Sequence, residues 1–191
     1  MGEKDLFHEP SVRVPLIICD PSALANETRG HVVEEFVEAV DVVPTLVELS
    51  GGTAPSERIE GRSLLSFVHQ KDGVPSWRDC AISEIDFSDR GPRALLDVHP
   101  YECRSRMIKT TKWKYIFHEH FPPQLFDLEN DLHEFIDLGG DPGYRAVRQE
   151  NYDRLFTWFR GLKARTETPT ETLFDKGPEL DEELGIMIGH W

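Results

Sequence analysis

Two histidines separated by one residue, His118 and His120, form the only closely spaced histidine pair in the chain. Residues two apart in a β-strand project from the same face, so both rings could bind one metal ion. No third ligand completes such a set nearby, and a metal site needs more than two protein ligands. The pair therefore predicts a structural role.

A second candidate lies near the N-terminus, where His8 and Glu9 precede a run of apolar residues. A histidine in a loop beside an anionic site can hydrogen-bond a substrate or alter the ionisation of its neighbours. Packing within the loop explains the same residue equally well, because many loop histidines have no chemical role. Both interpretations stay open at this point.

The elements that must position these residues begin with the apolar run over residues 12–19. Its β-branched composition predicts a strand covered on both faces, as in a parallel or mixed α/β sheet, although Pro15 favours an edge or a strand start. Helices are predicted over residues 44–50, with Asp41 as a possible N-cap and Gly51 as the stop, and over residues 64–68, with Ser63 as the cap.

From Gly73 onward, proline and glycine divide the chain into short strand-like runs over residues 80–87, 103–109, 113–118 and 124–128. Their tight connections predict an antiparallel sheet, with a hairpin at residues 110–112. Residues 143–164 carry apolar side chains at helical spacing and predict a long helix packed across this sheet. The last segment, 166–191, reads as an extended arm with an apolar end that needs a groove on its own subunit or on a neighbour.

Composition excludes several classes of protein. The 191 residues are 39% apolar and 29% charged, which is typical of a soluble globular chain, and the net charge of −14 argues against a nucleic-acid-binding surface. No apolar run is long enough to span a membrane. Three cysteines are too few for a disulfide framework or a zinc site, so the expected location is the reducing cytoplasm.

Several motifs occur in an order that resembles sulfatases and phosphonate monoester hydrolases of the alkaline phosphatase-like superfamily. The first is a lysine followed by an aromatic, an acid and Arg-x-Pro-Leu-Ile, from Lys4 to Ile17. Residues 41–45 resemble the family's Asp-x-x-Pro-Thr helix, and residues 61–64 resemble its Gly-x-Ser-Leu turn. Residues 112–116 and 125–129 resemble parts of its C-terminal sheet. The resemblance implies an α/β fold, in which a small four-stranded antiparallel sheet packs on a long C-terminal helix.

The same resemblance implies how the chain is divided. Residues 1–72 would be the end of a catalytic α/β domain, residues 73–165 a sheet-and-helix subdomain and residues 166–191 the arm. The family's metal-binding Asp-His pair and its Cys/Ser-x-Pro-x-Arg nucleophile motif are missing. The nearest match, at Cys19, has Ala23 where the arginine belongs, so Cys19 is expected to be a buried, small apolar residue. We therefore expect the C-terminal part of a longer enzyme, inactive alone.

By resemblance, Lys4 is the catalytic candidate, because its ammonium would contact the sulfuryl or phosphoryl oxygens of a small sulfate or phosphonate ester. His8 is a candidate for binding the same substrate. The intact enzyme would use a divalent metal ion (Ca²⁺, Mg²⁺ or Mn²⁺) and a formylglycine, neither held by this chain.

Two alternatives remain. The chain could be a non-catalytic module that assembles with partners, or a pseudo-enzyme that keeps the fold without the nucleophile. In either case the arm predicts a homo-oligomer.

Overall fold

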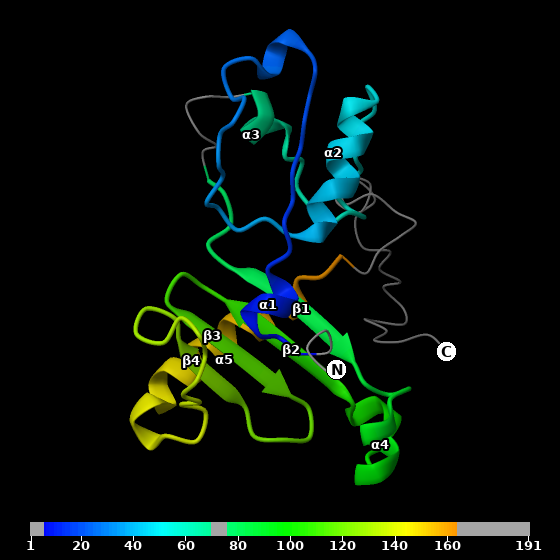
Figure 1. Ribbon diagram of the computed structural model, residues 1–191. Coiled ribbons are helices and arrows are strands. Elements are labelled where there is room, and N and C mark those ends of the chain that lie inside the picture. Colours follow the sequence, from blue (N-terminus) through cyan, green and yellow to red (C-terminus); the bar gives the residue numbers. More distant parts are fainter. Residues whose placement is uncertain (1–5, 70–75, 164–191) are drawn as a thin grey trace, which may run out of the picture.

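The computed structural model describes residues 6–69 and 76–163. Its centre is a four-stranded antiparallel sheet with the order β1-β2-β3-β4 (Figure 1). The strands are β1 (Ala81–Asp86), β2 (Arg104–Lys109), β3 (Trp113–His118) and β4 (Gln124–Asp127). This confirms the predicted meander and its hairpin at residues 110–112, with strand ends shifted by at most one residue.

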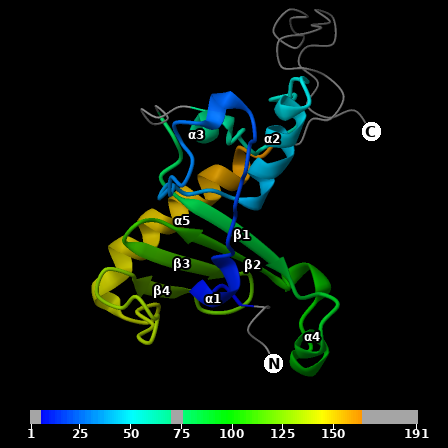
Figure 2. The same cartoon turned by 45° about the horizontal axis from the view of Figure 1, so that its top comes forward.

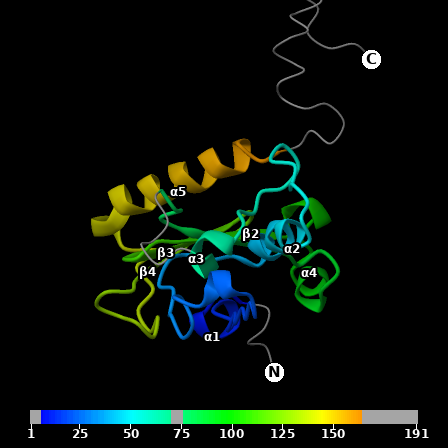
Figure 3. The ribbon, with the colours of Figure 1, turned by 90° about the horizontal axis from the view of Figure 1, so that it is seen from above.

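Helix α5 (Arg145–Arg160) covers one face of the sheet, and α1 (Glu9–Val12) lies on the opposite face, which the view from above separates clearly (Figure 3). The alternation of side chains along each strand explains the two layers. Tyr115 and Leu125 point toward α5 and pack with its Leu155, whereas Ile116 and Phe126 face α1 and pack with Phe7. The predicted packing of the long helix across the sheet is confirmed.

Helices α2 (Val42–Leu49) and α3 (Leu65–His69) lie beyond the β1 edge of the sheet (Figure 2). Both were predicted, with α2 starting two residues earlier than expected. Asp41 does precede α2, but its side chain does not cap the helix. It is fully buried and binds other groups, described below.

The predicted strand over residues 12–19 is wrong for this structure. Val12 ends α1, and residues 13–20 form neither helix nor strand. A strand needs a neighbour to take its backbone hydrogen bonds, and no described strand pairs with this run. Its side chains Val14, Leu16 and Ile17 are 69%, 47% and 90% exposed.

Helix α4 (Gly91–Leu96) was not predicted, because its glycine and proline were read as a loop. Proline is favoured in the first turn of a helix, where its missing N–H costs nothing. Helix α4 projects past the ends of β1 and β2 (Figure 1). None of the described helices is both long and apolar enough to cross a membrane.

Candidate functional site

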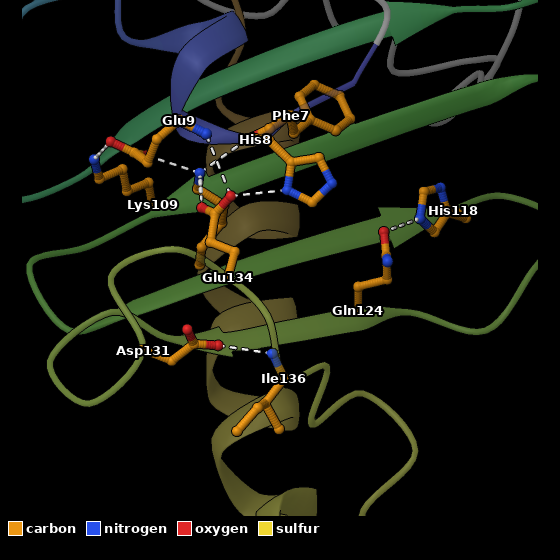
Figure 4. A network of polar contacts seen from close by, with 10 residues as sticks. Phe7, His8, Glu9, Lys109, His118, Gln124, Asp131, Glu134 and Ile136 are labelled. Atoms are coloured by element: carbon orange, nitrogen blue, oxygen red, sulfur yellow. Dashed lines mark hydrogen bonds and ion pairs between the residues drawn. The ribbon is translucent and has the colours of Figure 1, made fainter. Parts of the chain in front are cut away.

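The segment that carries His8 lies flat on the α1 face of the sheet (Figure 4). Phe7 is 7% exposed and packs among Met107, Ile116 and Phe126. Burying such a ring contributes about 2 kcal/mol relative to leaving it in water. Phe7 therefore fixes the backbone of this segment, and the position of His8 follows from it.

Lys114, in the middle of β3, holds the same segment by its charge. Its side chain is 0% exposed, and its ammonium donates to the Phe7 carbonyl at 2.9 Å and to Glu9 Oε1 at 2.7 Å. It also pairs with the carboxylate of Glu134. A buried ammonium is tolerated only when acceptors replace its water, and here the main chain and two carboxylates do so.

Glu9 links two lysines of adjacent strands. Its Oε2 lies 2.7 Å from Lys109 Nζ on β2, while Oε1 binds Lys114 on β3. Burial alone would raise the pKa of Glu9, but the two ammonium groups hold that pKa below its usual value. Glu9 is therefore a carboxylate at neutral pH, and it ties α1 to the sheet.

Glu134 reaches this network from the loop after β4. Its side chain is 2% exposed, and its Oε2 lies 2.9 Å from His8 Nδ1 and 3.3 Å from the Glu9 amide nitrogen. Its backbone φ of +59° is uncommon for a residue with a side chain, so the surrounding contacts hold it there. The His8 side chain is 44% exposed, with its ring edge-on to Phe126.

The predicted histidine pair is divided between separate partners. His118 Nδ1 lies 2.7 Å from Ser105 Oγ, and its Nε2 lies 3.2 Å from Gln124 Oε1. His120 faces Glu102 at 3.8 Å. His118 is thus held by hydrogen-bonding partners within the sheet. Among the described residues, no group of three His, Cys, Asp or Glu side chains could hold a metal ion.

Two of the sequence motifs interlock beside the sheet. The carboxylate of Asp41 accepts from both terminal nitrogens of Arg78 at 2.6 Å and from the Arg62 amide at 2.8 Å. Thr45 Oγ1 accepts from the Leu64 amide at 2.9 Å. The Asp-x-x-Pro-Thr helix thus binds the Gly-x-Ser-Leu turn and, through Arg78, the start of β1.

The sequence-predicted site residues differ in whether the structure describes them and in where it places them. Lys4 lies outside the described residues, and Cys19 is a free, exposed thiol, not the buried residue that was expected. Sequence reasoning missed Lys114 and Glu134. Strand alternation puts Lys114 on the same face as Ile116, which is a usable signal, but nothing in a polar loop marks Glu134 as its partner.

The chain can now be compared with known proteins. Residues 2–159 match the family described as "N-sulphoglucosamine sulphohydrolase, C-terminal". This chain belongs to that family. The match covers both interlocked motifs, the sheet and nearly all of α5, so membership in this sulfatase C-terminal family accounts for the whole described fold.

Relatives with curated names agree with this membership. The chain is 36% identical over 166 residues to the "Multifunctional alkaline phosphatase superfamily protein PehA" of Trinickia caryophylli, covering 85% of this chain and 31% of that protein. It is 31% identical over 186 residues to an arylsulfatase of Clostridium perfringens, covering 94% and 34%. The chain thus spans about a third of the length of these relatives.

Solved structures confirm the alkaline phosphatase-like fold class. The phosphonate monoester hydrolase of Agrobacterium radiobacter aligns with a TM-score of 0.60 and 30% identity, over 65% of this chain and 25% of that one. The phosphonate monoester hydrolase SpPMH from Silicibacter pomeroyi aligns with a TM-score of 0.65 and 25% identity, over 71% and 27%. Both aligned parts are small portions of larger proteins.

Proposed function

We propose that this chain is the C-terminal region of a metal-dependent hydrolase of sulfate esters or phosphonate and phosphate esters. Its family membership and its similarity to an arylsulfatase and to phosphonate monoester hydrolases support this function. In this proposal the substrate is a small molecule whose anionic ester group is recognised by fixed cations.

The family implies a divalent metal ion and a formylglycine nucleophile, and the described residues do not fit either group. They hold no cluster of three metal-ligating side chains. Cys19 lacks the arginine that the nucleophile motif requires, because Ala23 stands in its place. We assign both groups to a part of the intact protein that corresponds to the remaining two thirds of its relatives.

One observation carries the proposal most directly, the match of residues 2–159 to the sulfatase C-terminal family. A second observation is the exposure of large apolar side chains on the run over residues 12–19 and on α2, namely Val14, Leu16, Ile17, Val43, Leu46 and Leu49. These side chains are between 47% and 90% exposed. Because contiguous exposed apolar surface marks contacts with other protein, we propose that these two elements contact the remaining part of the intact enzyme.

The residues of this chain then have a defined task. Lys4 offers an ammonium, and His8 offers a partly exposed imidazole four residues later on a segment that Phe7 and Lys114 fix to the sheet. Cleavage of the ester develops negative charge on sulfuryl or phosphoryl oxygens, and preorganised donors stabilise that charge. Both residues are proposed to contact those oxygens.

Turnover tests the proposal. Aryl sulfates and phosphonate monoesters are offered to this chain alone and to the longest natural protein that contains it, with and without a chelator. We expect hydrolysis only by the longer protein, and loss of that hydrolysis with the chelator. Turnover by this chain alone would contradict the proposal. A well-folded longer protein without turnover would favour the non-catalytic module or the pseudo-enzyme.

A further inference from the structure

The two oxygens of the Glu134 carboxylate have different partners. Oε1 pairs with the buried ammonium of Lys114, and Oε2 faces His8 Nδ1 at 2.9 Å. The ion pair with Lys114 keeps the carboxylate charged, and a charged carboxylate only accepts hydrogen bonds. The proton of a neutral His8 must therefore reside on Nδ1.

This arrangement leaves the other nitrogen of His8 available. Among the described residues, His8 Nε2 has no hydrogen-bond partner, and the His8 side chain is 44% exposed. The ring also rests edge-on against Phe126. One nitrogen is thus fixed by Glu134, while the other can meet a ligand from solvent (Figure 4).

Glu134 itself has little freedom to move. Its side chain is 2% exposed, its backbone lies in the left-handed region, and it also accepts from the Glu9 amide. Its carboxylate also pairs with the ammonium of the fully buried Lys114. A partner held this firmly keeps a binding residue in one orientation, which lowers the ordering cost when a ligand arrives.

The charges around His8 favour an anionic ligand. Glu134, the charged group that contacts His8, belongs to a cluster joined by ion pairs that also contains Glu9, Lys109 and Lys114. Two carboxylates balance two ammonium groups. Protonation of His8 therefore adds one positive charge that the cluster does not neutralise, and an anionic ester group could do so.

We infer that Glu134 is a positioning residue that orients His8 so that, in the protonated ring, Nε2 donates to an anionic oxygen of the ester substrate while Nδ1 donates to Glu134. The inference rests on the proposed function, in which His8 binds that ester. Lys114 supports Glu134 in this task but does not touch the substrate.

A double-mutant cycle on the longest natural protein tests the inference. Glu134→Gln keeps the size of the side chain and removes its charge, and His8→Ala removes the ring. We expect Glu134→Gln to raise KM about tenfold with kcat nearly unchanged, the scale typical of losing a group that orients a histidine. In the His8→Ala background, Glu134→Gln should have no further effect on KM.

A matched control and a measurement without turnover complete the design. Asp20 also pairs with a histidine, His69, at 2.6 Å, so Asp20→Asn should leave KM unchanged. At a pH where the His8 ring is neutral, its ¹⁵N shifts should show the proton on Nδ1 in the wild type and a mixture of tautomers in Glu134→Gln. Circular dichroism verifies that each variant is folded.

The outcomes separate the two claims. Additive effects of the two substitutions on KM, or a neutral wild-type His8 whose single proton lies on Nε2, would overturn the inference and leave the proposed function standing. If the wild-type protein hydrolyses none of the esters, the proposed function fails and this inference fails with it.

Discussion

Lys114 is buried in a strand whose neighbours Tyr115 and Ile116 are also buried, so its ammonium depends entirely on protein acceptors. Removing one partner of a buried ion pair leaves the other charges without compensation, which costs more than the pair itself contributes. Lys114 therefore matters for stability because its removal would leave the carboxylates of Glu9 and Glu134 without its compensating charge.

We predict that Lys114→Met lowers the free energy of unfolding by about 3 to 5 kcal/mol, because Glu134 then stays buried without its ammonium partner. Urea unfolding measures the change. The control is Lys112→Met, which removes an exposed lysine paired with Glu129 at 2.7 Å and should change stability little. Equal decreases in unfolding free energy in the two variants would show that the buried ion pairs of Lys114 stabilise the fold no more than an exposed pair does.

Asp20 gives a prediction on pH. The hydrogen bond with His69 lowers the pKa of Asp20 to about 2, from its usual 3.8. A lowered pKa means that the folded state favours the carboxylate, so this stabilisation is complete above pH 4 and is lost as pH falls toward 2. Asp20→Asn should therefore flatten the dependence of unfolding free energy on pH between 4 and 2. An unchanged slope would argue against the His69 contact.

Lys4 provides the test of the chemistry proposed at the residue scale. In the longest natural protein, Lys4→Gln should lower kcat/KM for aryl sulfates or phosphonate monoesters by about 10²- to 10³-fold, as expected for removing a preorganised donor at a charged transition state. Lys112→Gln serves as the control lysine. A change smaller than about threefold would remove Lys4 from the proposed site.

At the scale of elements, the contact between α2 and the turn before α3 depends on a glycine. A Cβ at Gly61 would lie 2.0 Å from the carbonyl oxygen of Val40, far inside van der Waals contact. The turn must approach this closely so that the Arg62 amide reaches Asp41 and the Leu64 amide reaches Thr45. The glycine of the Gly-x-Ser-Leu motif is thus required by packing.

We predict that Gly61→Ala lowers the unfolding free energy by about 2 kcal/mol or more, because backbone atoms must move apart and weaken both hydrogen bonds. Thermal or urea unfolding detects the loss. At Gly140 a Cβ would meet nothing within 4 Å, so Gly140→Ala should stay within about 0.5 kcal/mol of the wild type. Similar stability of both variants would contradict the close approach.

At the scale of the whole molecule, the sheet and α5 enclose their own core, whereas large apolar side chains such as Ile17 and Leu46 are exposed. A self-contained core explains how the sheet can form from local strand pairing. These exposed side chains are the reason why we propose that the rest of the enzyme contacts their two segments. The arm predicted over residues 166–191 lies outside the described residues, so self-association through it remains a prediction.

Deletion of residues 166–191 tests that prediction. The wild-type chain and the truncated chain are compared by light scattering at equal concentration. If the apolar end of the arm binds a neighbouring subunit, the molar mass per particle should fall to that of a smaller assembly. An unchanged assembly in the truncated chain would exclude an intersubunit arm.

The sequence by itself determined the local elements with strong patterns. Alternation and tight turns predicted β1 to β4, and the apolar stripe from Val147 to Trp158 predicted α5, because these patterns act between residues close in the chain. The motifs also identified the family before any coordinates. The strand predicted at residues 12–19 failed because a strand is stable only with a neighbour, which local sequence cannot supply.

Only the tertiary structure decided what surrounds His8. Its partner Glu134 lies 126 residues away, and Lys114 comes from a third element, so no spacing in the sequence relates them. They meet because Phe7 packs into the α1 face of the sheet and brings the segment over β3. A cluster of buried charges is stable there only because each charge is paired with one of opposite sign. The packing of Phe7 against the sheet brings these paired groups together.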